Sequence, residues 1–363
     1  MTTRETIDYA KPFSRTRWFD VAARSAVRPE LSARVLLHAG PPFRGAPPAP
    51  VIHAAIQALL FEGLAPTAAA ARDLLLQGGA QLRPAQDYGI VTPLAQVVSA
   101  SMLLVAVEQQ NQVCYAPLIE GPAPALRFGS AAPECLRRLR DVSARIHSSV
   151  APLVRREPLA IDEIINAAVA AGDECHARTA AANEAMVSRL TGIDADCAAG
   201  LRANPAFVLT ILMAAAAAAL RTHRCDIEAI GGNGIDFGVR RRGDRAWRQM
   251  PADAARGSRL PGLDSIVALP AIGDSAVIDF CGLGGQALSV APLLAADWSG
   301  ALPADALTRR QELVDPDSGI VAPERIARAA AAPLINLAIL DRDGTAGLIG
   351  RGFYSPPVDL FSP

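Results

Sequence analysis

Nine consecutive residues, AGDECHART (171–179), gather groups that could perform acid–base or anion-binding chemistry in an otherwise alanine-rich stretch. The pattern predicts that one helix ends before Asp173 and that a second helix runs over residues 174–190, with Asp173 as its cap. His176 in the first turn would have a lowered pKa, because the positive end of a helix disfavours imidazolium. Asp173, Glu174 and His176 are therefore candidate catalytic residues. The alternatives are a simple cap for Asp173 and a capping or core role for His176.

Two glycine-rich stretches could bind an anion through backbone amides. GGNGIDFGVR (231–240) is a turn that enters a strand, and its candidate substrate-binding residues are Asn233, Gly234, Asp236 and Arg240. IGDSAVIDFCGLGGQAL (272–288) predicts a strand over 276–281, a turn through Gly284 and Gly285, and a helix that begins near Gln286 with its free amides in front. For the first stretch the alternative is a tight structural loop, and neither spacing matches a dinucleotide or P-loop motif.

Further polar residues lie where predicted elements end. Asp274 and Ser275 precede the second glycine stretch, and Ser275 is a conceivable nucleophile that lacks a GxSxG elbow. Asn336 lies on a strand before GLIGRG (347–352), for which an ordinary hairpin is the alternative. His38 ends the predicted buried strand 33–38 and is either a catalytic residue or a satisfied histidine. The candidate clamps for a carboxylate or phosphate are Arg127, Arg240 and Arg351.

Hydrophobic periodicity predicts an α+β protein with mixed α/β subdomains at both ends and a helical middle section. The predicted boundaries are 1–132 for the N-terminal subdomain, 133–225 for the helical subdomain and 226–363 for the glycine-rich C-terminal subdomain. The alanine-rich stretch 203–220 contains Asn204 and Pro205, so a buried helix is predicted there, with Asn204 as its N-cap, and not a membrane span.

Composition excludes several classes of function. The chain has 35 basic and 36 acidic residues and a net charge of −1, so neither nucleic acid nor an anionic membrane is an expected partner. Lys11 is its single lysine, which argues against Schiff-base chemistry. The six cysteines show no CxxC pair and are predicted to be reduced thiols. No spacing requires a metal, no cofactor is evident, and without an apolar leader segment the protein is expected to be cytoplasmic.

In order along nearly the whole chain, the motifs resemble those of the YlbE/AllG-type family, which is associated with FdrA-type proteins. The motifs that carry the resemblance are LLHAGPP (36–42), LRFG (126–129), GDECHAR (172–178), NGIDFGVR (233–240), IGDSAVIDFCGLGG (272–285) and INLAI with GLIGRG (335–352). The resemblance implies a subunit of oxamate carbamoyltransferase, which converts oxalurate and phosphate into oxamate and carbamoyl phosphate, or the reverse. The segment 86–94, which contains histidine in the family, has none here.

Three hypotheses for function follow. The first is carbamoyl or related acyl transfer on a small ureido or amide acid, with phosphate or carbamoyl phosphate as a further substrate. The second is a diverged family member that acts on another small anionic substrate in a biosynthetic pathway, as the altered segment 86–94 suggests. The third is a non-catalytic assembly subunit. The resemblance also implies an FdrA-type partner subunit, and a homo-oligomer is expected.

Overall fold

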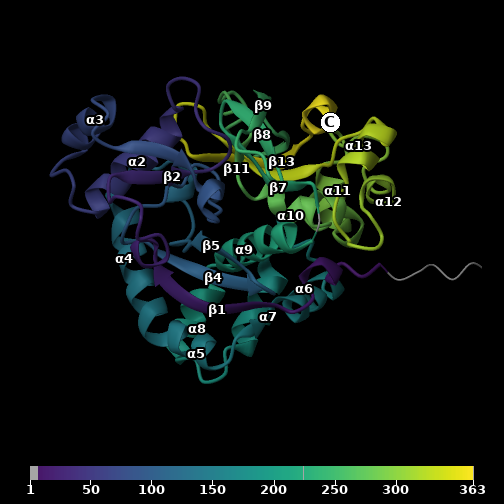
Figure 1. Ribbon diagram of the computed structural model, residues 1–363, viewed down its shortest axis with the longest axis horizontal. Helices are drawn as coiled ribbons and strands as arrows, with labels where there is room; N and C mark the ends of the chain where they lie inside the picture. The colour runs from purple at the N-terminus through teal and green to yellow at the C-terminus, as the bar shows by residue number, and fades with distance from the viewer. Residues whose placement is uncertain (1–6, 224, 363) are drawn as a thin grey trace, which may run out of the picture.

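The computed structural model describes residues 7–223 and 225–362, and in that part of the chain it confirms an α+β fold (Figure 1). The strands are β1 (Thr16–Ala23), β2 (Val35–His38), β3 (Gln81–Pro84), β4 (Leu103–Gln109), β5 (Gln112–Pro117), β6 (Leu159–Ala160), β7 (Ile227–Asn233), β8 (Asp236–Arg241), β9 (Arg248–Pro251), β10 (Arg256–Arg259), β11 (Ile272–Gly273), β12 (Ile335–Leu340) and β13 (Leu348–Tyr354). The helices are α1 (Arg24–Val27), α2 (Ala49–Phe61), α3 (Ala68–Leu76), α4 (Pro133–Arg145), α5 (Ala151–Arg156), α6 (Ile161–Ala170), α7 (Ala180–Arg189), α8 (Ala195–Arg202), α9 (Phe207–Thr222), α10 (Ala276–Phe280), α11 (Pro292–Asp297), α12 (Arg309–Leu313) and α13 (Pro323–Ala329).

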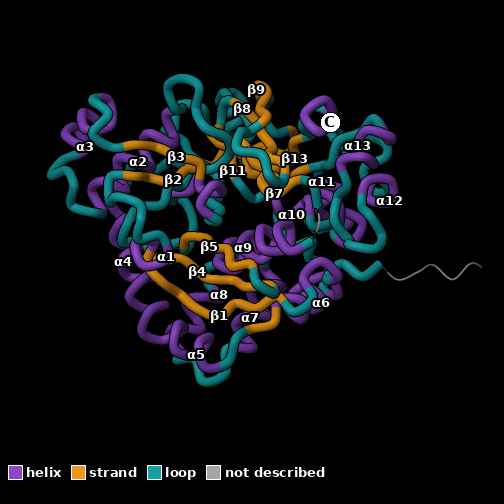
Figure 2. The backbone as a smooth tube through the Cα atoms, in the orientation of Figure 1, coloured by secondary structure: helices purple, strands orange, loops and turns teal. Residues whose placement is uncertain are grey.

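The strands form small sheets, and β1, β4 and β5 lie apart from the group that contains β7, β8, β9, β11 and β13 (Figure 2). One antiparallel sheet has the order β5-β4-β1-β6, a second has the order β11-β7-β8-β9, and a third has the order β10-β13-β12. β2 and β3 pair in parallel, and the chain between them forms α2 and α3. Such a crossover is what a parallel strand pair requires, because its strands cannot be joined by a tight turn.

Helix α9 lies between two of these sheets and forms the centre of the core (Figure 1). It contacts β1, β4 and β5 on one side and β7 and α10 on another. Its residues 207–208 and 210–220 are buried, including the six consecutive alanines 214–219. Alanine lets the neighbouring backbones approach closely because its side chain is a single methyl group. The buried helix predicted over 203–220 is thus confirmed.

No single helix in the described ranges is long and apolar enough to cross a membrane; α8 and α9 meet the criteria of length and composition only as a pair, with a bend of 78° between them. All six cysteines are free thiols, as predicted.

The predicted helix over 174–190 is wrong at its start, because α7 begins only at Ala180. Cys175 has a φ of +67°, which a right-handed helix does not allow. The carboxylate of Asp173 accepts the amide of Cys175. The carboxylate of Glu174 accepts the amides of Ala177 and Arg178. These side chains satisfy the backbone locally and hold residues 173–179 as an ordered loop.

Two expectations for the stretch 272–288 are also wrong. Residues 276–280 form the short helix α10 and not a strand, and an apolar run of this length fits a buried helix as well as a buried strand. Near Gln286 there is only a 3₁₀ turn, 284–286, and no α-helix. Asn204 is not the N-cap of α9, since its amide donates to the carbonyl of Ile119 and the N-cap is Ala206.

The subdomain boundaries at 132/133 and 225/226 remain predictions. β1 from the N-terminal stretch pairs with β4 and also with β6 from the predicted helical section. One large hydrophobic cluster contains residues of all three predicted subdomains. The elements that build the site are therefore held against a shared interior.

Candidate functional site

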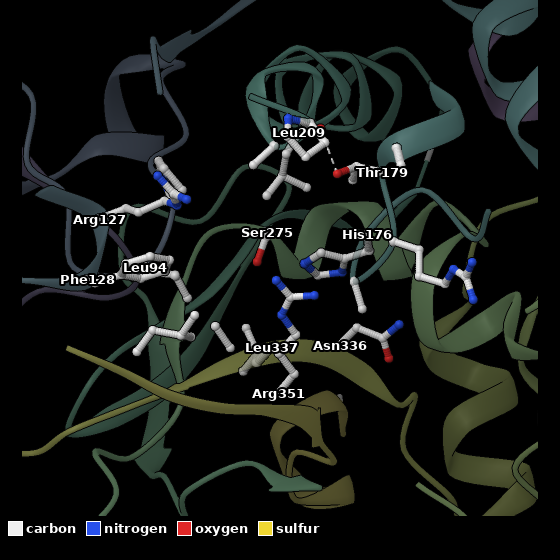
Figure 3. A pocket seen from close by; sticks show the side chains of 18 residues that line it. Leu94, Arg127, Phe128, His176, Thr179, Leu209, Ser275, Asn336, Leu337 and Arg351 are labelled. Atoms are coloured by element: carbon white, nitrogen blue, oxygen red, sulfur yellow. Dashed lines mark hydrogen bonds between the residues drawn. The ribbon is translucent and has the colours of Figure 1, made fainter. Parts of the chain in front are cut away.

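A cavity of about 290 Å³ opens between the loop 173–179, the start of α9, α10 and strands β12 and β13 (Figure 3). Its lining contains three arginines and one histidine but no acidic residue. The lining residues are Pro93, Leu94, Arg127, Phe128, His176, Ala177, Arg178, Thr179, Ala180, Pro205, Ala206, Leu209, Ser275, Asn336, Leu337, Ala338, Leu348 and Arg351. A cavity with cationic groups and no acid in its wall favours a negatively charged ligand.

His176 is held by Asp279, a residue of α10. Nδ1 of His176 lies 2.8 Å from Oδ2 of Asp279, and both side chains are almost completely buried. Burial by itself would lower the pKa of His176, but the charges of Asp279 and Glu174 outweigh it, so the pKa is raised from its usual value. The expectation of a lowered pKa is corrected for this reason, and because no helix begins at residue 174. The imidazole points into the cavity (Figure 3).

Asp279 is in turn fixed by backbone amides. Its Oδ1 accepts the amide of Gly285 at 2.7 Å and the amide of Asn336 at 3.1 Å. Gly284 has a φ of +52°, and a Cβ on it would lie 2.3 Å from Oδ1 of Asp279. Only glycine fits this approach. Gly284 and Gly285 are not among the residues that line the cavity. Gly284 leaves room for the carboxylate of Asp279, and the amide of Gly285 donates a hydrogen bond to it.

Glu174 lies behind the cavity and not in it. The carboxylate is fully buried, accepts the amides of Ala177 and Arg178, and accepts Nδ2 of Asn336 at 3.0 Å. The carbonyl of Glu174 accepts the amide of Gly284 at 2.8 Å. Burial raises the pKa of Glu174. The GDECH and GLGG stretches are thus in contact, through the hydrogen bond between Gly284 and Glu174.

Asp173 caps the region around the start of α7. Its Oδ2 accepts the amides of Ala181 and Ala182 at 2.8 and 3.2 Å, while Oδ1 accepts the amide of Cys175 at 2.8 Å. It lies outside the cavity lining. These contacts fit the alternative given for Asp173, a capping role at the start of a helix.

Arg127 and Arg351 face the cavity from different elements (Figure 3). Arg127 is 6% exposed, and one nitrogen donates to the carbonyl of Gly121 at 2.7 Å. Burial, together with the positive charges of Arg138 and Arg351, lowers its pKa to about 10 even though Glu120 opposes the shift. The guanidinium of Arg351, an exposed residue of β13, has no hydrogen-bond or ion-pair partner in the described part of the chain and is available to a ligand in the cavity.

Ser275, Asn336 and Thr179 provide the remaining polar groups. Ser275 points into the cavity beside His176 (Figure 3). Oδ1 of Asn336 is buried and has no hydrogen-bond partner among the described residues. Thr179 donates to the carbonyl of Pro205 at 2.8 Å, which ties the loop to the start of α9. The apolar part of the lining includes Leu94, Phe128, Leu209, Leu337 and Leu348.

A second group of candidates lies elsewhere, around the loop 39–42. The amide of Asn233 donates to the carbonyl of Pro41 at 3.0 Å, and its oxygen accepts the amides of Ile235 and Asp236. Gly234 has a φ of +86° and forms the turn between β7 and β8. Asp236 accepts Nε2 of Gln249 at 2.8 Å. The GGNG stretch therefore does not meet the GDECH and GLGG stretches at the cavity.

Asp274 anchors the same region. Its carboxylate accepts the amides of Gly40 and Thr92 and the side-chain amide of Gln86. Burial raises the pKa of Asp274 to about 7 against these hydrogen bonds. Arg240 forms ion pairs with Asp87 at 2.8 Å and Glu228 at 2.9 Å. Neither residue lines the cavity.

His38 is buried at the end of β2. Nδ1 contacts the carbonyl of Ala39 at 2.8 Å, and Nε2 has no partner in the described ranges. Burial lowers the pKa of His38 to about 4. The ring lies 4.3 Å from that of Phe43, centre to centre. It does not reach the cavity lining, so the structure places His38 in the core.

Asp279 is the main site residue that the sequence did not single out. It sits in the apolar run AVIDF, and an acidic residue inside a buried run is a signal, because a buried carboxylate requires partners. Arg178, which also lines the cavity, lies in the AGDECHART stretch but is not among the predicted site residues. Within the described ranges, no three His, Cys, Asp or Glu residues are grouped as a metal ion would require.

The sequence of this chain is similar to a known protein family and to two curated proteins. The family model described as "Oxamate carbamoyltransferase subunit AllG" matches residues 80–275. Two curated proteins of Escherichia coli (strain K12) are similar over most of their length. The oxamate carbamoyltransferase subunit AllG is 28% identical over 388 residues, which cover 96% of this chain and 92% of the relative. The "Uncharacterized protein YahG" is 26% identical over 373 residues, covering 92% and 79%.

A solved structure shows the same fold. The crystal structure of a conserved protein of unknown function from Enterococcus faecalis V583 has a TM-score of 0.84, at 24% identity, and the match covers 98% of this chain and 94% of the other.

Proposed function

Because the chain belongs to the AllG family, we propose that it is a subunit of an enzyme that transfers a carbamoyl or related acyl group to or from a small amide acid. Oxamate, or oxalurate in the reverse direction, is the substrate type, with phosphate or carbamoyl phosphate as the second reactant. The observation that supports this proposal is the cavity wall, which presents Arg127, Arg178, Arg351 and His176 without any acidic residue. Both the carboxylate of the acid and the phosphate need such cations.

The residues divide into two roles. In phosphorolysis of oxalurate, a phosphate oxygen would form a bond to the ureido carbon while the bond from that carbon to the amide nitrogen breaks. The leaving oxamate nitrogen must then gain a proton. His176 can donate it, because Asp279 favours its protonated form. Arg127 and Arg351 would neutralise the carboxylate and the phosphate, and the side chain of Asn336 would orient the amide acid.

A second candidate substrate class is favoured by the apolar part of the lining. Leu94, Phe128 and Leu209 are among the apolar side chains that line the cavity together with the cationic groups. A two-carbon amide acid offers nothing apolar to contact them, whereas an acid with an aliphatic substituent would. Leu94 belongs to the segment 86–94 that departs from the family pattern. The alternative proposal is therefore a diverged member that acts on a larger, partly apolar anionic substrate.

Assembly is the remaining part of the proposal. The similar E. coli protein is named as a subunit, and we expect this chain to function with a partner of the FdrA type or as a homo-oligomer. A non-catalytic assembly role is the competing interpretation. Turnover by the reconstituted complex that depends on His176 would contradict it.

The test of the anion site is ligand binding to cavity variants. Arg351→Gln and His176→Gln should each weaken binding of oxamate or carbamoyl phosphate by about tenfold or more, because a hydrogen bond to a charged group contributes about 1.5–3 kcal/mol. Titration calorimetry on the full chain measures this, and thermal unfolding checks that the variants fold.

Arg17→Gln provides the matched control, since Arg17 is an exposed arginine on β1. It should bind both anions like the parent protein. Equal binding by all three variants would rule out the cavity as the anion site. A preference for acids with an aliphatic substituent over oxamate, lost in the cavity variants, would support the second candidate.

A further inference from the structure

A second cavity, of about 200 Å³, lies between α4, α8 and the segment that follows β5. It shares no lining residue with the first cavity. Its lining residues are Glu120, Arg138, Asp141, Val142, Arg145, Ile146, Cys197, Gly200, Leu201 and Asn204. A π-helical turn (146–150) follows α4 at this point, and such turns often accompany functional sites.

The buried acceptor in this cavity is Glu120. It is only 6% exposed, and its Oε1 accepts the amide of Leu126. Its Oε2 is buried and has no hydrogen-bond partner in the described part of the chain. An unsatisfied buried carboxylate oxygen is costly. The cavity therefore offers an acceptor that requires an N–H or O–H donor.

Two arginines supply the opposite charge. Arg138 donates from Nη1 to the carbonyl of Pro122 at 2.9 Å and from Nη2 to the carbonyl of Pro124, while its buried Nε has no partner among the described residues. The guanidinium of Arg145 forms no hydrogen bond or ion pair in those same ranges. It lies over α8, since a Cβ on Gly200 would be 2.6 Å from Nη1 of Arg145. Asp141 also lines the cavity, so a carboxylate bound here must lie against Arg138 and Arg145, away from Asp141 and Glu120.

We propose that this second cavity binds a small acid that carries an N–H donor, with the donor on Oε2 of Glu120 and the carboxylate on Arg138 and Arg145. The shared chemistry is a carboxylate a few atoms from either an ammonium or an amide nitrogen. A volume of about 200 Å³ is many times the roughly 10–15 Å³ of cavity space that a single water needs. An amino acid or ureido acid of about five to eight heavy atoms fits this space.

The test uses the full chain and three kinds of probe in titration calorimetry. Glycine and alanine carry an ammonium, N-carbamoylglycine carries a neutral ureido group, and acetate carries the carboxylate alone. Either the amino acids or N-carbamoylglycine should bind at least about tenfold more tightly than acetate. Tighter binding of the amino acids would identify an ammonium as the donor to Glu120, and tighter binding of N-carbamoylglycine would identify a ureido N–H. Equal binding of acetate would show that Glu120 takes no part.

Two variants locate the binding. Glu120→Gln keeps an oxygen for the amide of Leu126 but loses the carboxylate, so affinity should fall by about tenfold or more. Gly200→Leu places a side chain in the cavity from a helical position and should abolish binding. Thermal unfolding of each variant verifies that it folds.

Arg351→Gln, in the first cavity, should leave this affinity unchanged. If Arg351→Gln abolishes binding and Glu120→Gln does not, the probe occupies the first cavity and the inference is wrong. Absence of binding by every probe at millimolar concentration also overturns it. The inference does not depend on the proposed function, which is tested with oxamate and carbamoyl phosphate on variants of Arg351 and His176.

Discussion

At the scale of single residues, the pairing of His176 with Asp279 decides the charge in the first cavity. A histidine at the start of a helix would be biased towards its neutral form, but this one lies in a loop and 2.8 Å from a buried carboxylate. Its pKa is raised, so its positive charge is present at low pH and is lost as the pH rises through that raised value. Below that pKa, His176 adds a positive charge to those of the arginines.

Affinity for oxamate should consequently fall as the pH rises through the raised pKa of His176. Asp279→Asn removes the charge that stabilises imidazolium, so the fall should move to lower pH. Oxamate suits this measurement because its carboxylate stays ionised across the range, unlike phosphate. Dissociation constants measured by calorimetry over a pH series provide the profile.

Asp315→Asn controls for the loss of one acidic residue. The carboxylate of Asp315 accepts the backbone amide and the hydroxyl of Ser318, away from the cavity. The parent profile should persist in this variant. An unchanged profile in Asp279→Asn would mean that His176 does not carry the charge that binds the anion.

At the scale of elements, the loop 173–179 carries His176 and is held by its own carboxylates. Asp173 accepts the amides of Ala181 and Ala182 at the start of α7 and also the amide of Cys175. Cys175 is in a left-handed conformation, which costs about 1–2 kcal/mol for a residue with a side chain. The loop keeps this conformation because the surrounding hydrogen bonds specify it.

Asp173→Ala should lower the free energy of unfolding by about 1–3 kcal/mol, since it removes a cap and leaves buried amides without an acceptor. It should also weaken binding of oxamate, because His176 loses its fixed position. Urea denaturation and calorimetry measure the two effects.

Asp194→Ala is the matched control for this loss of a cap. Asp194 is the N-cap of α8 and accepts the amide of Cys197 at 2.9 Å. Its loss should reduce stability by about 0.5–2 kcal/mol while oxamate affinity stays at the parent value. Similar binding losses in both variants would trace the effect to stability and not to the loop.

At the scale of the whole molecule, α9 joins the sheets that surround the site. It contacts β1, β4, β5 and β7, and its buried residues include the six consecutive alanines 214–219. Cys281, at the end of α10, lies 3.5 Å from the carbonyl of Ala216. This close approach places α10, and with it Asp279, against the central helix.

Ala216→Leu should destabilise the protein by about 1–3 kcal/mol, because Ala216 is fully buried and a larger side chain cannot enter the core without displacing its neighbours. Urea denaturation measures the change. Ala185→Leu on α7, at a half-buried position, is the control and should cost less. Equal stability of parent and Ala216→Leu would mean that the contact between α9 and α10 is loosely packed.

The sequence alone determined the α+β class and the family. Hydrophobic periodicity is a local property, so the strand predicted over 33–38 and the helix predicted over 203–220 correspond to β2 and α9. The sequence also pointed to His176, Ser275 and Asn336. These three side chains line one cavity.

Only the tertiary structure decided which distant segments meet. Asp279 pairs with His176, and Arg351 comes from the last strand, although local pattern links none of them. The GGNG turn, with Asn233 and Asp236, has as much polar chemistry but contacts the loop 39–42 instead. Which of these segments meet at the cavity depends on how the sheets and α10 pack around α9. That packing is a sum of many contacts between residues far apart in the chain, and no short stretch of sequence contains it.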